Sequence, residues 1–250
     1  MALLIPQELI ERLATARRVA VLTGAGISAE SGIPTFRDAL TGLWAQYDPQ
    51  QLATPEGFSR DPKRVWEWYA ERRRQIAGVQ PNPGHRALAA LAARFQSFAL
   101  VTQNIDSLHQ RAGSTDVIEL HGNIARVRCS REQIVVADFT EDESPPRCGC
   151  GAWLRPDVVW FGETLPLDAL AKAEAAAADC QVFLSVGTAA EVYPAAELPL
   201  AAKRAGATLV EINPQATALT QLADFVLQER AGTALPLLLK ALAASAPTGP

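Results

Sequence analysis

The sequence has few cysteines and no long apolar run. Four cysteines in 250 residues are too few and too clustered for the disulfide framework of a small secreted protein, so we expect reduced thiols, some of them metal ligands. No stretch reaches the roughly 18 continuous apolar residues of a membrane-spanning helix, because charged side chains interrupt every Ala- and Leu-rich segment. These features exclude a disulfide scaffold and a chain that crosses a membrane.

The chain also lacks an excess of positive charge. Lys and Arg total 23 against 27 Asp and Glu, which gives a formal net charge of -4 at pH 7. Without a basic field to hold a polyphosphate backbone, we expect no nucleic-acid partner. The first residues offer neither the basic region nor the apolar core of a signal peptide, so we expect a cytoplasmic protein. We further expect a monomer.

Short apolar runs rich in β-branched residues alternate with longer helical segments. The predicted strands are residues 19–22, 98–102, 117–120, 182–186, 208–212 and 225–227. The clearest predicted helices are residues 86–95, 167–179 and 195–205. Most of the strands lack polar alternation, as strands buried on both faces do. The pattern predicts an α/β fold with a Rossmann-like, doubly wound parallel sheet.

Two segments interrupt this alternation. Residues 35–83 are far longer than one crossover connection, and residues 122–166 hold three of the four cysteines. We interpret both as insertions that form a small helical, zinc-ribbon-like module. Residues 1–34, 84–121 and 167–250 then form the Rossmann-like domain, with a cleft between the two units.

A glycine-containing loop follows the first predicted strand and includes Gly24, Ala25, Gly26 and Ser28. Glycines after a buried strand let the backbone turn tightly and approach a pyrophosphate. The pattern is not a complete G-x-G-x-x-G, and no clear ribose-binding acid follows about twenty residues later. Nucleotide binding and a tight turn without a ligand both stay open at this point.

Polar residues follow the second predicted strand, where Gln103, Asn104 and Asp106 flank Ile105. Such side chains destabilise a loop beside a buried strand unless they form hydrogen bonds. One interpretation is contact with an amide of a ligand. The other is a helix cap, in which Asn104 or Asp106 satisfies a helix that starts near Ser107.

The three histidines occupy different positions. His85 begins a predicted helix and His109 lies inside one, so we interpret both as structural. His121 directly follows the strand at residues 117–120, and ligands gather at the carboxyl ends of strands in open α/β sheets. An unperturbed pKa of about 6.5 suits proton abstraction at neutral pH. His121 is therefore the candidate general base.

Together these motifs resemble those of the sirtuins, NAD-dependent protein lysine deacylases. The resembling segments occur in the family's order and cover nearly the whole chain: residues 24–37, 102–106, 121–122, 158–163, 187–188 and 212–213. The resemblance implies that NAD is the cofactor and that acyl-lysine proteins or peptides are the substrates. The implied products are deacylated lysine, nicotinamide and O-acyl-ADP-ribose.

The resemblance also implies roles for individual residues. His121 matches the general base, which accepts a proton from a ribose hydroxyl. The segment that includes Val159, Phe161 and Gly162 matches one that pairs with the substrate peptide as an added strand. The implied NAD contacts are Gly24, Ala25, Gly26, Ser28, Phe36, Arg37, Gln103, Asn104, Ile105, Asp106, Gly187, Thr188, Asn213 and Ala231.

Tyr69 and Arg72 are three residues apart, on one face of a predicted helix. Such a pair is most often a half-buried surface contact. It also resembles the Tyr-x-x-Arg signature of sirtuins that remove succinyl, malonyl and glutaryl groups, in which Ala53 would leave room for a longer acyl chain. An arginine binds a carboxylate through two charge-assisted hydrogen bonds, whereas a neutral acetyl group leaves it unpaired. We therefore predict a desuccinylase and demalonylase that deacetylates more weakly.

Sirtuins typically hold a structural zinc ion between two cysteine pairs. Here Cys129 is followed three residues later by Glu132, and the second pair is Cys148-x-Cys150. These three thiolates are an incomplete set, one ligand short of a closed tetrahedral site. Glu132 or another group would have to supply the fourth ligand, so zinc stays an open expectation. Two rival functions also stay open: an NAD-binding regulatory module without turnover, and a mono-ADP-ribosyltransferase.

Overall fold

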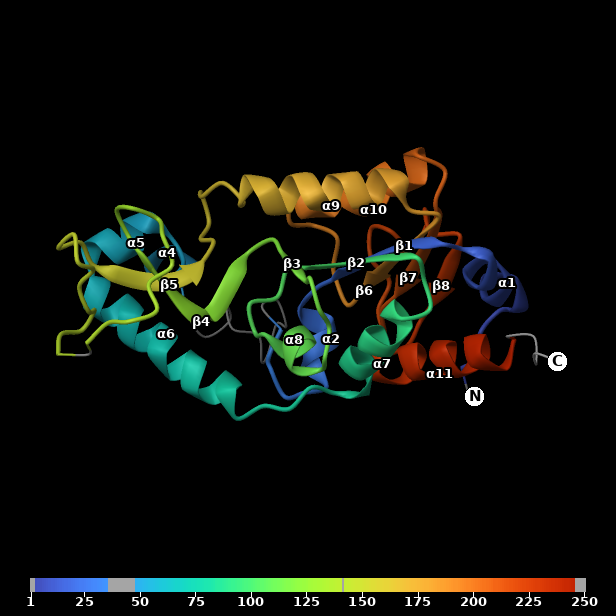
Figure 1. The fold of residues 1–250 in the computed structure, drawn as a ribbon, viewed down its shortest axis with the longest axis horizontal. Coiled ribbons are helices and arrows are strands. Elements are labelled where there is room, and N and C mark those ends of the chain that lie inside the picture. The colour runs from blue at the N-terminus through green and yellow to red at the C-terminus, as the bar shows by residue number, and fades with distance from the viewer. Residues whose placement is uncertain (1–2, 36–47, 141, 246–250) are drawn as a thin grey trace.

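The computed structural model describes residues 3–35, 48–140 and 142–245. Two of the predicted NAD contacts, Phe36 and Arg37, lie outside these residues. The elements form two groups: a six-stranded sheet with helices on both faces, and a two-stranded sheet packed with a separate set of helices (Figure 1).

The large sheet has the strand order β3-β2-β1-β6-β7-β8. Its strands are β1 (Arg18–Thr23), β2 (Ser97–Thr102), β3 (Ile118–Glu119), β6 (Val182–Val186), β7 (Thr208–Ile212) and β8 (Phe225–Leu227). All neighbouring pairs are parallel, which confirms the predicted fold class. The chain runs outward from β1 to β3 and then returns to β6 on the other side of β1. This reversal is the switch point at which open α/β sheets form their ligand crevice.

Helices cover both faces of this sheet (Figure 1). One face carries α1 (Gln7–Thr15), α7 (Pro83–Ala92) and α11 (Ala231–Ala244). The other carries α9 (Leu167–Asp179), η1 (Ala195–Glu197) and α10 (Leu198–Arg204). Because successive strand residues face opposite sides, Val21 lies in the first core and Leu22 in the second. The strands are therefore apolar on both faces, as predicted.

The smaller sheet pairs β4 (Gly122–Cys129) with β5 (Leu154–Val158) in antiparallel orientation. It packs with α4 (Pro49–Leu52), α5 (Pro55–Arg60) and α6 (Pro62–Ala77). Each of these helices begins at a proline that follows a capping Asp or Thr side chain, an arrangement that starts a helix efficiently. Trp66 of α6 shares an apolar cluster with Val127 and Leu154, so the two predicted insertions share a core. The exact ranges of the two units stay a prediction.

Two short helices, α2 (Ala25–Ala29) and α8 (Leu108–Arg111), follow β1 and β2 at the carboxyl edge of the large sheet. Within residues 3–35, 48–140 and 142–245, no helix is both long and apolar enough to span a membrane.

Candidate functional site

The predicted NAD contacts meet at the carboxyl edge of the large sheet, beside the switch point between β1 and β6. The Gln103 amide, after β2, donates to the Thr188 hydroxyl, after β6, at 3.0 Å. The Asn213 amide, after β7, donates to the Thr188 carbonyl at 3.1 Å. Three strands that are far apart in sequence thus bring these side chains together.

Three glycines at this edge touch backbone to backbone. A Cβ added at Gly24 or Gly26 would lie 2.8 or 2.7 Å from the Gly187 carbonyl oxygen. The Gly26 amide donates to that same oxygen at 2.8 Å. Gly187 has φ +59, and a Cβ there would lie 2.5 Å from the Ile27 amide nitrogen. The glycines are therefore required by contact between two loops of the protein itself, which supports the tight-turn interpretation; their contact with NAD stays a prediction.

The polar residues after β2 also bond within the protein. The buried Asn104 amide donates to the Gly24 carbonyl at 3.0 Å and to the Ser28 hydroxyl at 3.2 Å. The Ser28 hydroxyl in turn donates to the Asp106 carboxylate at 2.7 Å. Asp106 also accepts the Leu108 amide of α8 at 2.9 Å, so the helix-cap interpretation is confirmed for this residue. Burial raises the pKa of Asp106.

Two other predicted contacts are placed by their elements. The Ile105 carbonyl accepts the Ile124 amide of β4 at 2.9 Å, which ties the polar loop to the smaller sheet. Ala231 begins α11, is buried, and lies against Gly84 at the start of α7.

His85 and His109 are buried beside this loop, with ring centroids 4.9 Å apart. His109 Nε2 lies 2.9 Å from the Thr23 hydroxyl. His85 Nε2 lies 3.4 Å from the Ser28 hydroxyl, a link that the sequence did not reveal. Burial lowers the pKa of His85 to about 4 and that of His109 to about 3. Both rings are therefore neutral at pH 7, which supports their interpretation as structural.

His121 follows β3 with Leu120 between them, one residue beyond the end of the strand. Its Nδ1 lies 2.9 Å from the Gln103 carbonyl oxygen, which can only accept, so Nδ1 carries the hydrogen and Nε2 holds the free lone pair. Burial lowers the pKa of His121, against the opposing effect of this hydrogen bond. Gly122 follows with φ +76, and a Cβ there would lie 2.2 Å from the Asp157 carbonyl oxygen. The lowered pKa keeps the His121 ring neutral at pH 7. The bond from Nδ1 leaves Nε2 as the atom that accepts a proton.

The segment expected to bind peptide bridges the two units. The Val159 amide donates to the His121 carbonyl, and the Phe161 amide donates to the Ala53 carbonyl, each at 2.9 Å. The Phe161 side chain is 50% exposed, and Gly162 adopts φ +86. This segment therefore connects the candidate base to the predicted acyl pocket.

The predicted acyl-pocket residues lie near one another. Ala53 and Tyr69 are buried in one apolar cluster together with Trp160. The Trp160 indole N–H donates to the Tyr69 hydroxyl at 3.0 Å. Burial raises the pKa of Tyr69 far above its usual range, and the positive charge of Arg72 partly opposes this rise. Arg72 is half-buried, with its guanidinium 5.4 Å from the Trp68 ring centroid.

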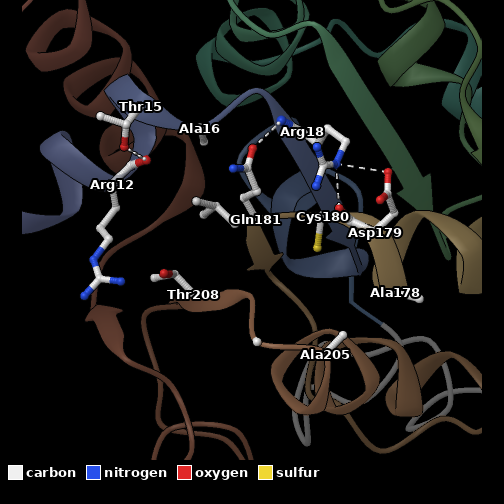
Figure 2. A pocket seen from close by; sticks show the side chains of 12 residues that line it. Arg12, Thr15, Ala16, Arg18, Ala178, Asp179, Cys180, Gln181, Ala205 and Thr208 are labelled. Atoms are coloured by element: carbon white, nitrogen blue, oxygen red, sulfur yellow. Dashed lines mark hydrogen bonds and ion pairs between the residues drawn. The ribbon is translucent and has the colours of Figure 1, made fainter.

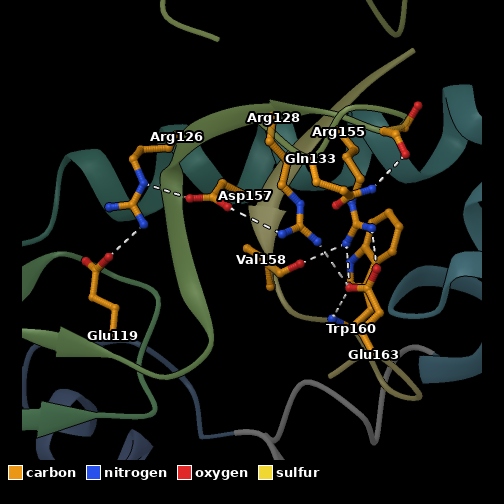
Figure 3. Close-up of polar contacts among 10 residues, drawn as sticks. Glu119, Arg126, Arg128, Gln133, Arg155, Asp157, Val158, Trp160 and Glu163 are labelled. Atoms are coloured by element: carbon orange, nitrogen blue, oxygen red, sulfur yellow. Dashed lines mark hydrogen bonds and ion pairs between the residues drawn. The ribbon is translucent and has the colours of Figure 1, made fainter. Parts of the chain in front are cut away.

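A buried ion pair, which the sequence analysis missed, holds this segment (Figure 3). Arg155 is 3% exposed and donates to both Glu163 carboxylate oxygens at 2.5 and 2.8 Å. It also donates to the Val158 carbonyl at 2.8 Å. The available signal was an arginine next to the apolar Leu154 in a short strand, because a buried charge requires a partner.

Glu132 joins the three predicted metal ligands. The Sγ atoms of Cys129, Cys148 and Cys150 and a Glu132 carboxylate oxygen all lie within 4.8 Å of one another. Cys129 and Cys150 Sγ are 3.5 Å apart, close to the ~3.8 Å between sulfurs in a tetrahedral site with Zn–S bonds of about 2.3 Å. Burial raises the pKa of Cys129, but amide hydrogen bonds from Glu132 and Arg131 outweigh it and lower the pKa. These four groups fit a structural zinc ion.

A cavity of about 410 Å³ lies elsewhere, at the amino edge of the large sheet (Figure 2). Polar lining groups are bonded within the protein: the Gln181 amide oxygen accepts the backbone amides of Arg18, at 3.1 Å, and of the neighbouring Arg17, at 2.7 Å. Arg18 also pairs with Asp179 at 3.0 Å. None of the predicted site residues lines this cavity, so we assign the candidate site to the carboxyl edge.

Known proteins are similar to this chain over nearly its whole length. The model of the Sir2 family matches residues 24–194. An NAD-dependent protein deacylase of Ralstonia nicotianae is 55% identical over 229 residues, which cover 90% of this chain and 92% of that protein. An NAD-dependent protein deacylase of Methylococcus capsulatus is 52% identical over 250 aligned residues, which cover 96% of this chain and 98% of that protein.

Solved structures give the same result. A complex of a Sir2 homologue with NAD has 42% sequence identity and a TM-score of 0.89, covering 98% of this chain and 96% of that chain. A complex of Sir2 with a p53 peptide and NAD+ has 34% identity and a TM-score of 0.85, covering 97% of this chain and 100% of that chain. The chain belongs to the Sir2 family.

Proposed function

We propose that this protein is an NAD-dependent protein lysine deacylase with His121 as its general base. The observation that carries the proposal is the 2.9 Å contact from His121 Nδ1 to the Gln103 carbonyl, because it leaves Nε2 as the proton acceptor. The base stands at the carboxyl edge of the sheet, where the loop of Gln103 also contacts Thr188. The relatives named NAD-dependent protein deacylases support the same activity.

NAD supplies the ADP-ribosyl group to which the acyl chain is transferred, with release of nicotinamide. The loops that contain Gly24, Asn104 and Gly187 would hold it, and Asn213 and Ala231 would border its adenosine half. With NAD bound, His121 Nε2 would accept the proton of a ribose hydroxyl, which would let a ribose oxygen attack the acyl carbon. The Val159–Gly162 segment would hold the peptide as an added strand beside this base. Acyl-lysine, NAD and one water would thus give deacylated lysine, nicotinamide and O-acyl-ADP-ribose.

We further propose a preference for acyl groups that end in a carboxylate. Burial keeps the Tyr69 hydroxyl protonated, so it is a hydrogen-bond donor. The charge of Arg72 lies close enough to affect the pKa of that hydroxyl, and Ala53, in the same cluster, is small. A carboxylate between a hydroxyl donor and a guanidinium gains charge-assisted bonds that an acetyl group does not form.

Matched acetyl-, succinyl- and malonyl-lysine peptides test both proposals. With NAD, we expect nicotinamide release and O-acyl-ADP-ribose, with a higher kcat/KM for the acidic acyl groups. Arg72→Met should lower kcat/KM for succinyl-peptide at least about tenfold, as expected for the loss of a charge-assisted pair, and spare acetyl-peptide. Mass spectrometry follows both products.

Other results separate the rival functions. NAD binding without nicotinamide release identifies a regulatory module. Nicotinamide release with ADP-ribose attached to protein, and no O-acyl-ADP-ribose, identifies a mono-ADP-ribosyltransferase. Equal loss of both acyl activities in Arg72→Met contradicts the acidic-acyl preference alone.

We also propose that Cys129, Glu132, Cys148 and Cys150 bind one structural zinc ion. The site lies against the apolar cluster of Trp66, Val127 and Leu154. It would join the end of β4 to the loop that precedes β5 and would not take part in the reaction.

A further inference from the structure

We propose that Trp160 is a positioning residue for acyl-group selection: its indole N–H fixes the Tyr69 hydroxyl so that Tyr69 donates its own hydrogen to the acyl carboxylate. This inference rests on the proposed preference for acidic acyl groups. It deepens that proposal by naming what sets the direction of the tyrosine hydrogen.

The hydrogen bond between the two side chains has only one direction. An indole nitrogen donates and cannot accept, so the Tyr69 oxygen is the acceptor in the 3.0 Å contact with Trp160 Nε1. The ring centroids of these residues are 6.2 Å apart, and Phe58 packs on Trp160 at 5.3 Å. The phenolic hydrogen must therefore point away from Trp160. The Tyr69 hydroxyl therefore accepts a hydrogen bond from the protein and can donate its own hydrogen to a ligand.

Trp160 is held at two places, the face of its indole ring and its backbone amide (Figure 3). The Arg155 guanidinium lies 3.3 Å from the Trp160 ring centroid, a cation–π contact. Glu163 accepts both from Arg155 and from the Trp160 backbone amide, the latter at 2.8 Å. Because Arg155 is itself buried and paired, turning the indole would break its contact with this guanidinium, while Glu163 holds the backbone of the same residue. The Arg155–Glu163 pair thus fixes the donor that orients Tyr69.

The same short segment is the one expected to hold the peptide, and the protein anchors it on both sides of Trp160. Val159 and Phe161, on either side of Trp160, bond through their amides to the His121 and Ala53 carbonyls. Trp160 is buried whereas Phe161 is exposed, so the segment presents its indole to the acyl pocket and its neighbour to the outside. The position of the peptide and the direction of the tyrosine hydrogen are therefore set by one backbone segment.

Trp160→Phe removes the N–H and keeps an aromatic ring. We expect it to lower kcat/KM for succinyl-peptide about fivefold more than kcat/KM for acetyl-peptide, the effect of one neutral hydrogen bond, mainly through KM. Tyr69→Phe should show the same selectivity loss or more, and the double variant should match Tyr69→Phe alone. Trp153→Phe is the control, since Trp153 stacks under Arg147, with the guanidinium 3.6 Å from its ring centroid.

The outcomes separate this inference from the function it rests on. A succinyl preference that survives Trp160→Phe, an equal loss for both peptides, or a further loss in the double variant overturns the role of Trp160 alone. A wild-type protein that releases nicotinamide with acetyl-peptide but shows no succinyl preference overturns the acidic-acyl proposal as well. If Trp160→Phe does not fold, Arg155→Lys, which keeps the charge beside Glu163 but loses the planar stack, must reduce the same selectivity.

Discussion

At the scale of single residues, the chemistry depends on which nitrogen of His121 carries the hydrogen. The Gln103 carbonyl determines this by accepting from Nδ1. The side chain of the same residue donates to Thr188 in the loop after β6. One residue therefore sets the tautomer of the base and fixes a loop expected to hold NAD.

Replacing His121 by Ala should lower kcat at least about a hundredfold, the usual contribution of a general base. NAD affinity should stay close to that of the wild type, because the loops of Gly24 and Gly187 are held by their own backbone contacts. Nicotinamide release measures the first effect and calorimetric titration with NAD the second. A variant that turns over at the wild-type rate excludes His121 as the base.

The pH profile of the wild type provides a further readout of this prediction. Only the neutral ring accepts a proton, so activity should fall as pH decreases through the pKa of His121. Burial lowers that pKa, which places the acid limb of kcat/KM below the ordinary value of about 6.5. An acid limb at or above this value contradicts the inferred environment of the ring.

At the scale of elements, periodicity and composition predicted the strands of the large sheet well but did not predict β4 or β5. Residues 182–186, 208–212 and 225–227 agree with β6, β7 and β8. β3 is shorter than the apolar run that predicted it, because it is the edge strand and pairs only with the last residues of β2. Helix α7 begins three residues before the predicted start, at Pro83, since the Asn82 side chain caps its first amides.

Contacts between distant loops could not be predicted in the same way. The sequence placed Gly24 and Gly187 at strand ends. It did not show that the Gly187 carbonyl accepts a hydrogen bond from the Gly26 amide. The sequence offered Glu132 as one candidate for the fourth metal ligand but could not select it over other groups. The loop that brings Glu132 to Cys148 has no periodic pattern from which its path could be predicted. Sequence patterns identify which residues lie at an edge, whereas their partners depend on tertiary packing.

The zinc proposal predicts one metal ion per chain in the purified protein. Glu132→Ala should lower zinc occupancy and the unfolding temperature, because three thiolates leave the fourth position of the tetrahedron to water. Glu143→Ala is the matched control, as it removes an exposed acid paired with Arg147 in the same region. Elemental analysis and thermal melts, with and without a chelator, measure both effects. Metal-free protein with an unchanged melt contradicts the site.

At the scale of the whole molecule, the site is assembled from both units. The base follows β3 of the large sheet, and the predicted acyl pocket lies among α4, α6 and the segment after β5. The chain passes from one unit to the other at Gly122, directly after His121. The geometry of this junction therefore places the base relative to the pocket.

Gly122→Ala should destabilise this junction. A Cβ there would lie 2.2 Å from the Asp157 carbonyl oxygen at φ +76, and a strained backbone position costs about 1 to 3 kcal/mol. Urea unfolding measures the loss. Gly78→Ala is the control, since its Cβ would have 3.7 Å to the Gln75 carbonyl oxygen. Equal stability of the two variants would show that the junction can relax.

The contact among Gly24, Gly26 and Gly187 has a consequence for engineering this protein. All three positions lack room for a methyl group because each already touches the backbone of another member. A substitution at one of them therefore has no compensating change at the other two, because every alternative residue is larger than glycine. In a mutational library, only glycine should be tolerated at these three positions. Folding lost by a substitution at one of them should be restored by reversion to glycine and not by a change at another of the three.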